Sequence, residues 1–196
     1  MSRRRRKGLN FAAPKKKLSA TVIKEIWNYI FIIVAAVLVA FVLVFSIGLK
    51  TSMIGVSMEP ELYNGQEVLV NRFIYKLISP KVDDIVVFLP NGNQNSHYYI
   101  KRIAAKPGDT VAIRDGVLFV NDVPYIEHPL DKIADAGILE NELVLEDDEY
   151  FLIGDNINNS EDSRSSNIGP VSKARIVGKV WFHMGSSESG MGFMND

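Results

Sequence analysis

Residues 98–104 read Tyr-Tyr-Ile-Lys-Arg-Ile-Ala, a short β-branched and aromatic run with two adjacent cations inside it. In a strand, side chains alternate between faces, so Lys101 lies on the side of Tyr99 and Ile103 while Arg102 points the other way. A lysine in such a run is commonly a surface residue whose stem packs and whose ammonium reaches water. If it is buried, its pKa falls and the amine becomes able to accept a proton. The run therefore predicts a β-strand that carries a candidate base.

Six further segments have the same strand-like character, and turns rich in Gly, Pro, Asn and Asp separate them. Asp115-Gly116, between two short apolar runs, predicts a tight β-hairpin. Because no long amphipathic helix interrupts these segments, the sequence predicts a mainly β fold class, an antiparallel β-sheet domain. Residues 127–149 are acidic and are expected to form a loop with a short helix. The further strand segments are 66–75, 84–89, 110–113, 117–120, 150–153 and 175–183.

A long apolar run, Ile26–Leu49, precedes the predicted strands and contains only mildly polar exceptions. About 20 such residues in a helix cross the roughly 30 Å hydrocarbon core of a bilayer. A cleaved signal peptide is the alternative, but its apolar core has only about 7–15 residues. The run therefore predicts an uncleaved transmembrane helix.

The charge is unevenly distributed, because the formal net charge is −1 while eight Lys and Arg residues crowd positions 3–17. Such a run alone is typical of a tail that binds nucleic acid. Next to an apolar run it indicates the cytoplasmic end, facing anionic headgroups, so no nucleic acid partner is expected. The predicted organisation is a basic cytoplasmic tail at 1–25, a transmembrane helix at 26–49, an extracytoplasmic β catalytic domain at 50–184 and a flexible tail at 185–196.

The sequence contains no cysteine, which excludes thiol catalysis, disulfides and Cys-based zinc sites. Its three histidines, His97, His128 and His183, show no ligand-like spacing, so neither a metal nor a cofactor is expected. The serine in Gly55-Val56-Ser57-Met58-Glu59-Pro60 is a candidate nucleophile, and a serine needs a base to remove its proton. His128 and His183 are expected to be surface or edge residues, and His97 lies near a strand start, so no histidine is favoured as the base. Among the lysines, Lys101 has the apolar neighbours that a base for Ser57 needs, although taken alone it is more commonly a surface residue.

Residues 154–164 read Gly-Asp-Asn-Ile-Asn-Asn-Ser-Glu-Asp-Ser-Arg, directly after a predicted strand. On its own such a stretch is a long polar turn. However, Asp162 can pair with Arg164, and the Ser160 hydroxyl can bond an amine. Together the three side chains could orient a buried lysine.

These motifs resemble those of bacterial type I signal peptidases, which cut signal peptides from exported proteins with a Ser/Lys dyad. The resemblance covers roughly residues 20–184, and Gly55 and the short connection between the second and third motifs are similar to compact Gram-positive members. Lys101 differs from the endoplasmic-reticulum branch, which has histidine there. The resemblance rests on Ser57-Met58-Glu59-Pro60 with Leu62, on Lys101-Arg102-Ile103 with Pro107-Gly108-Asp109, and on Gly154-Asp155-Asn156 with Ser160, Asp162, Ser163 and Arg164.

The resemblance implies that Ser57 is the nucleophile and Lys101 the general base. It implies that Ser160 hydrogen-bonds the lysine and that Asp162 and Arg164 form an ion pair which shapes the site. The substrate is implied to bind as an added strand. The other implied supporting residues are Gly154, Asp155, Asn156, Met58, Pro60, Gly55 and Arg102, and the implied substrate-contacting residues are Val56, Tyr98, Tyr99 and Ile100.

The sequence departs from the family pattern in three places. Ile157-Asn158 stand where Arg-Asp is frequent, which predicts altered supporting contacts, and Glu61 stands where threonine is frequent. Gly55 stands where some members carry a serine hydroxyl in the oxyanion hole. Because glycine has no side-chain donor, the Ser57 backbone N–H is expected to act alone or with another backbone donor.

The resemblance implies a single-pass serine endopeptidase of the bacterial cell membrane, with its catalytic domain on the outer face. It would remove N-terminal signal peptides from exported preproteins, cutting after small residues through an acyl-enzyme. Its implied partners are those signal peptides, the lipid bilayer and, as a further candidate, the translocation machinery. The alternatives are a self-cleaving Ser/Lys protease similar to the SOS-repressor family, an anchored non-catalytic peptide-binding β domain, and an anchored lipid- or nucleic-acid-binding protein.

Overall fold

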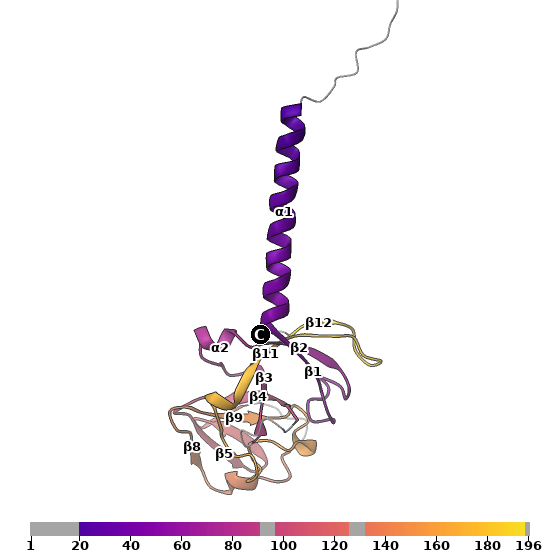
Figure 1. Cartoon of the computed structure of the whole chain (residues 1–196). Coiled ribbons are helices and arrows are strands. Elements are labelled where there is room, and N and C mark those ends of the chain that lie inside the picture. Colours follow the sequence, from indigo (N-terminus) through magenta and orange to yellow (C-terminus); the bar gives the residue numbers. More distant parts are fainter. Residues whose placement is uncertain (1–19, 91–96, 126–131, 195–196) are drawn as a thin grey trace, which may run out of the picture. The chain divides into compact units, whose positions relative to one another are not determined.

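The structure, a computed structural model, describes residues 20–90, 97–125 and 132–194 (Figure 1). His128 therefore lies outside the described residues. The chain divides into two compact units, Met1–Phe45 and Ser46–Asp196. The first unit contains most of helix α1 (Ala20–Ile47), in which Thr21–Phe41 has a mean hydropathy of 2.0. By length and composition, this helix is able to cross a membrane.

The bounds of α1 differ from the expected 26–49 at both ends. The helix already begins at Ala20, because the stretch 20–25 contains neither proline nor glycine to interrupt it. It ends at Ile47, because Gly48 and Leu49 pair with Asn71 and Val70 as the first residues of a strand.

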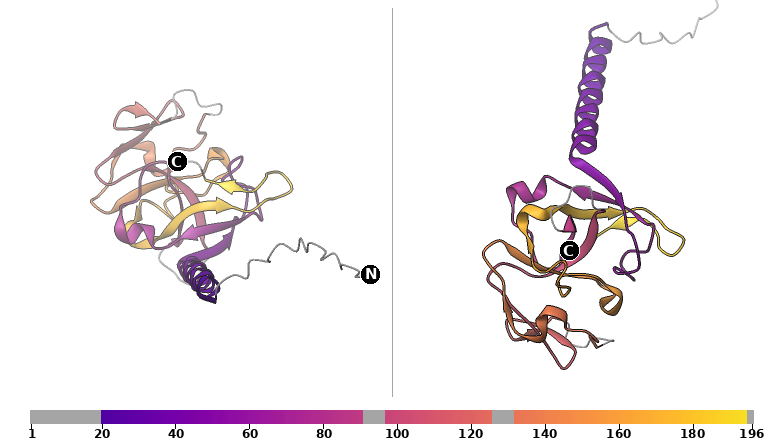
Figure 2. Two further views of the ribbon diagram at one scale, coloured as in Figure 1. Left: turned by 90° about the horizontal axis from the view of Figure 1, so that it is seen from above. Right: turned by 60° about the horizontal axis from the view of Figure 1, so that its bottom comes forward.

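The described strands of the second unit form two sheets in which every pair is antiparallel (Figure 1; Figure 2), which confirms the predicted mainly β class. The larger sheet has the order β1 (Gly48–Ser52), β2 (Glu67–Asn71), β11 (Ile176–His183), β3 (Ile85–Phe88), β4 (Tyr99–Ala105), β9 (Glu149–Ile153) and β10 (Val171–Ser172), with β12 (Gly192–Phe193) beside β11. The smaller sheet has the order β7 (Val123–Pro124), β6 (Val117–Val120), β5 (Thr110–Arg114) and β8 (Leu143–Val144). Short helices are α2 (Ile74–Leu77), η2 (Gly137–Glu140), η3 (Ile157–Asn159) and η4 (Lys173–Arg175).

The predicted hairpin at Asp115-Gly116 is confirmed, with Arg114 opposite Val117 and positive φ at both turn residues. The strand predicted at 66–75 is shorter than expected. It ends at Asn71, whose side-chain oxygen accepts the backbone N–H groups of Phe73 and Ile74 and so turns the chain into α2.

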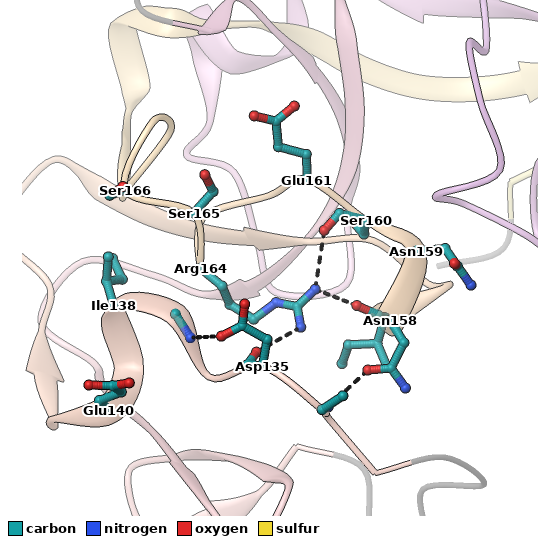
Figure 3. Close-up of a pocket in the computed structure, with 13 residues that line it drawn as sticks. Asp135, Ile138, Glu140, Asn158, Asn159, Ser160, Glu161, Arg164, Ser165 and Ser166 are labelled. Carbon is teal, nitrogen blue, oxygen red and sulfur yellow. Dashed lines mark hydrogen bonds between the residues drawn. The ribbon is translucent and has the colours of Figure 1, made fainter.

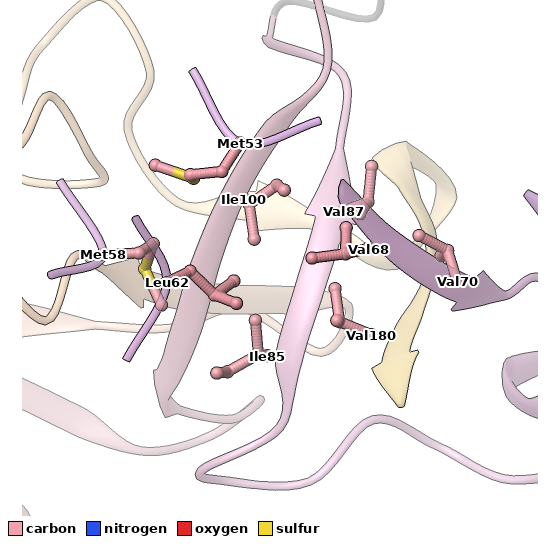
Figure 4. Packing of buried hydrophobic residues seen from close by; sticks show 9 residues of the cluster. All are labelled: Met53, Met58, Leu62, Val68, Val70, Ile85, Val87, Ile100 and Val180. Atoms are coloured by element: carbon pink, nitrogen blue, oxygen red, sulfur yellow. The ribbon is translucent and has the colours of Figure 1, made fainter. Parts of the chain in front are cut away.

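The core of the larger sheet also holds the segment that follows β1. Met58 and Leu62 are fully buried in a cluster with strand residues such as Ile100 (Figure 4). Because Met58 directly follows Ser57 and Leu62 lies four residues further on, packing of these side chains into the core fixes where the serine lies. The cluster consists of Met53, Met58, Leu62, Val68, Val70, Ile85, Val87, Ile100 and Val180.

The segment from residue 185, expected to be a flexible tail, instead returns to the sheet as far as it is described. Gly192 and Phe193 pair with His183 and Phe182, as the yellow C-terminal end in Figure 2 shows. The buried Gln66 amide nitrogen lies 2.8 Å from His183 Nδ1 and donates to Met184 O at 2.8 Å and Ser189 Oγ at 2.9 Å. Two paired residues are too few to leave a periodic sequence pattern.

Gly178 is needed where β11 passes β2, because a Cβ there would lie 2.4 Å from the backbone oxygen of Asn71. Replacing Gly178 with alanine is expected to lower the free energy of unfolding by about 1–3 kcal/mol, through overpacking. Urea unfolding of the detergent-solubilised protein measures this. Gly190→Ala is the control, because a Cβ there meets nothing within 4 Å. Equal unfolding midpoints for the two variants would contradict the prediction.

Candidate active site

The Ser57 loop is held by hydrogen bonds at the serine and at the two residues before it. Gly55, at φ +82°, donates its N–H to Asn64 Oδ1 at 2.9 Å. The backbone N–H of Asn156 bonds Ser57 O at 3.1 Å, and the Asn156 side chain bonds Val56 O at 3.2 Å. These bonds hold the loop that positions the serine hydroxyl. The contribution of Asn64 was not predicted, because the dipeptide Asn64-Gly65 indicated only a turn.

The Lys101 side chain contacts the Ser57 side chain directly. Its Nζ donates to Ser57 Oγ at 2.7 Å and to the carbonyl of Ile100 at 3.2 Å. Lys101 is 4% exposed and Ser57 8% exposed. The strand alternation is as predicted. Tyr99 packs against the apolar cluster that contains Ile103, whereas Ile100 belongs to the cluster of Met58 and Leu62 on the opposite face.

Burial lowers the pKa of Lys101 to about 8 from 10.5, because a buried ammonium loses its hydration. The charges of Asp162, Glu161 and Asp155 act in the opposite direction and raise it. The Tyr99 ring centroid lies 5.6 Å from the amine. About one tenth of the lysine is therefore neutral at pH 7, compared with less than one thousandth for a lysine in water.

Asp162 and Arg164 form the expected ion pair (Figure 3 shows Arg164 with its neighbours). The Asp162 carboxylate accepts Arg164 Nε and Nη2, each at 2.9 Å, and also the N–H of Gly154 at 3.1 Å. The guanidinium further donates to the carbonyls of Ile157, Ser160 and Asp135. A buried ion pair needs such additional bonds to offset the loss of water. Here the bonds also connect the two ends of the loop 154–164, because Gly154 and Arg164 both bind Asp162.

Gly154 allows this loop to pass directly behind the serine. A Cβ at Gly154 would lie 2.4 Å from the Ser57 carbonyl oxygen and 2.3 Å from Ser160 Oγ. Any larger residue would displace one or both. Asp155, the next residue, binds Arg102 through two bonds of 2.8 Å, and this contact raises the pKa of the arginine.

The bond that the resemblance implied between Ser160 and Lys101 is absent from the structure. Ser160 Oγ is buried and has no hydrogen-bond partner among the described residues. Lys101 Nζ instead donates to the Ile100 carbonyl, which belongs to its own strand.

Ile157 and Asn158, which depart from the family pattern, contact residues outside the loop 154–164. The Asn158 side chain accepts the N–H of Ala134 at 3.0 Å and donates to the carbonyl of Lys132 at 2.9 Å. The Ile157 side chain packs against an apolar cluster that includes Leu118, Leu139 and Phe151. The loop is thereby attached to residues 132–134, a contact that the sequence did not predict.

The edge of β4 near Lys101 is open on one side. Pairing of β4 with β9 begins only at Arg102, opposite Ile153, so within the described chain no strand lies along that edge beside Tyr98, Tyr99 and Ile100. Val56 is 43% exposed. An extended peptide could add to such an edge through backbone hydrogen bonds.

No group of His, Asp or Glu side chains in the described parts of the chain has an arrangement suited to a metal ion. His183 Nδ1 lies 2.8 Å from the Gln66 amide, and His97 is exposed. The hydroxyl of Ser57 is therefore bonded to an amine, not to an imidazole.

Comparison with known proteins agrees with the resemblance. The profile of the family described as "Signal peptidase, peptidase S26" matches residues 26–184. Signal peptidase I P of Bacillus subtilis subsp. natto is 35% identical over 159 residues, covering 74% of this chain and 83% of that protein. Signal peptidase IB of Staphylococcus aureus (strain COL) is 32% identical over 177 residues, which cover 81% of this chain and 89% of that protein. A signal peptidase I crystal structure from Enterococcus faecalis is 27% identical, with a TM-score of 0.41, covering 52% of this chain and 96% of that one.

The lowered pKa of Lys101 can be measured directly. With lysine labelled by ¹³C at Cε, one resonance is expected to titrate near pH 8, whereas exposed lysines titrate above pH 10. The resonance should be missing in Lys101→Met and still present in Lys81→Met, which removes an exposed lysine. If all lysine resonances titrate above pH 10, the amine is not desolvated as the structure describes.

Proposed function

Because this chain belongs to the signal peptidase family, peptidase S26, we propose that it removes N-terminal signal peptides from exported preproteins as a membrane-anchored serine endopeptidase. Ser57 is the nucleophile and Lys101 the general base. The observation that carries this proposal is the 2.7 Å contact between the buried amine and the serine hydroxyl. It brings together a candidate nucleophile and a base of suitable pKa.

The reaction begins when neutral Lys101 takes the Ser57 proton as Oγ attacks the scissile carbonyl carbon. The resulting oxyanion is stabilised by backbone N–H groups, since Gly55 offers no side-chain donor. Lys101 then returns the proton to the leaving amine, the C–N bond breaks, and an ester to Ser57 remains. A water that loses a proton to Lys101 hydrolyses this ester and restores the serine.

The substrate residues before the cut lie extended along 52–56 and the open edge at Tyr98–Ile100. Val56, Tyr98, Tyr99 and Ile100 shape shallow subsites for small side chains. The exposed β4 edge supports this placement, because strand addition requires unpaired backbone groups.

The apolar helix α1 anchors the enzyme, with the basic residues 3–17 on the cytoplasmic side and residues 50–196 on the outer face. Support comes from the length and hydropathy of Thr21–Phe41 and from the eight cations that precede it. Signal peptides and the bilayer are then its partners, and the translocation machinery is a candidate.

Removing either reactive group should abolish cleavage. Ser57→Ala and Lys101→Met are each expected to lower kcat/KM for a preprotein by about 10²–10⁴-fold or more, because each removes a group that acts in the transition state. Mass measurement of the cut ends after incubation with the detergent-solubilised protein provides the assay. Lys81→Met is the matched control and should retain activity. Normal cleavage by either dyad variant, or failure of an acylating serine inhibitor to label Ser57, would refute the dyad.

The pH dependence follows from the protonation of Lys101. Because the neutral amine is the active form, kcat/KM should rise about tenfold per pH unit below pH 8 and level off above it. Glu161 raises this pKa, so Glu161→Gln should move the rise to lower pH. A rate that is constant between pH 6 and 9, or a midpoint that Glu161→Gln leaves unchanged, would argue against Lys101 as the titrating base.

A further inference from the structure

The Glu161 side chain binds a residue of the open β4 edge. The Tyr99 hydroxyl donates to Glu161 Oε2 at 3.3 Å, although 62 positions separate the two residues in the sequence. We propose that Glu161 is a positioning residue, which holds the Tyr99 ring in place and thereby limits the size of the substrate side chain directly before the cut. This inference rests on the proposed function and adds to it a residue that determines specificity.

The Tyr99 ring lies beside the reacting groups. Its centroid is 5.6 Å from Lys101 Nζ, and that nitrogen lies 2.7 Å from Ser57 Oγ. In the proposed reaction, the carbonyl carbon of the residue before the cut forms a bond to this same oxygen. The side chain of that residue therefore branches from the peptide close to the ring. A bulky side chain there would overlap the ring unless the ring moved.

The ring is held at both of its ends. Tyr99 lies directly opposite Phe88 in the sheet, and the two rings meet edge to face with their centroids 5.8 Å apart. Phe88 is fully buried, so the packed interior prevents the ring from retreating on this side. The hydroxyl at the far end of the ring is held by Glu161. The bond to Glu161 thus decides whether this end of the ring can swing outward.

The backbone around Glu161 is firmly fixed, so its side chain has a rigid base. Asp162 is 1% exposed and bonds Arg164 through both carboxylate oxygens. Ser163 is fully buried, and its hydroxyl accepts the N–H of Leu152 at 3.0 Å. In Figure 3 the Glu161 side chain points away from the Arg164 guanidinium, so its carboxylate is available to the tyrosine.

The bond at position 161 can be separated from the charge at the same position. Burial and the Glu161 carboxylate raise the pKa of Tyr99, so the tyrosine keeps the proton that it donates. Glutamine at 161 has an oxygen that can accept this proton but carries no charge. Alanine has neither the acceptor nor the charge. A comparison of Glu161→Gln with Glu161→Ala therefore isolates the effect of the bond.

The test uses preprotein peptides that differ only at the residue directly before the cut, which is Ala, Val or Leu. The full-length protein in detergent is expected to cleave the Ala peptide with a kcat/KM at least about tenfold above that of the Val peptide. Glu161→Ala and Tyr99→Phe should each reduce this preference about three- to tenfold, because both release the end of the ring. Glu161→Gln should keep the preference of the unaltered protein.

The ratio of kcat/KM for two peptides separates the ring from the base. Within one variant both peptides react with the same Lys101, so a change in the protonation of this lysine cancels in the ratio. Glu161→Gln is therefore expected to shift the pH dependence without changing the ratio. The double variant Tyr99→Phe with Glu161→Ala should show the ratio of a single variant, because each substitution removes the same bond.

Two controls accompany these variants. Glu146→Ala removes an exposed carboxylate from the turn before β9, and it should keep the full preference for the Ala peptide. A second set of peptides carries Ala, Val or Leu two positions before the cut. Because side chains alternate along an extended peptide, this position faces away from the ring, and its ratios should be the same in all variants.

An Ala-to-Val ratio that stays unchanged in Tyr99→Phe or in Glu161→Ala would overturn the positioning role and leave the proposed function intact. An equal loss of preference in Glu161→Gln and Glu161→Ala would also overturn it, because the charge and not the bond would then be responsible. If the unaltered protein cleaves no peptide, the proposed function fails and the role of Glu161 falls with it.

Discussion

The site depends on one buried amine whose charge is finely balanced. Burial of Lys101 disfavours the ammonium, and nearby carboxylates favour it. The net lowering from 10.5 to about 8 corresponds to about 3 kcal/mol of lost preference for the charged form. Asp162, the carboxylate with the largest effect on this pKa, is bound by Arg164 and by the Gly154 N–H. A carboxylate without such partners would hold the lysine in its charged form, and the proposed base would be lost.

The remainder of the domain serves to place a hydroxyl against that amine. Met58 and Leu62 anchor the loop in the core, and Asn156 holds the Val56 and Ser57 carbonyls. Gly154 leaves room for the backbone of Ser57. Packing thus sets the serine to within the distance of a hydrogen bond, which is the precision that a proton transfer requires.

Much of this arrangement could be predicted from the sequence because it depends on local patterns. Strand alternation places Lys101 on one face, and the Asp115-Gly116 hairpin follows from two residues that tolerate positive φ. What could not be predicted depends on long-range contacts. The early end of β2 comes from the Asn71 side chain, the attachment of residues 132–134 comes from Asn158, and Ser160 lacks the bond expected of it. A hydrogen bond between distant segments leaves no periodic signal in the chain.

Gln66 links regions that are remote in sequence, and this has a practical consequence for handling the protein. Its backbone oxygen accepts the Met53 N–H, and its side chain bonds Met184 and Ser189. The C-terminal segment is thereby coupled to the residues that enter the Ser57 loop. Deleting Met184 or Ser189 would leave the buried Gln66 amide without one of these partners, so a shortened recombinant enzyme should keep the chain at least as far as Ser189.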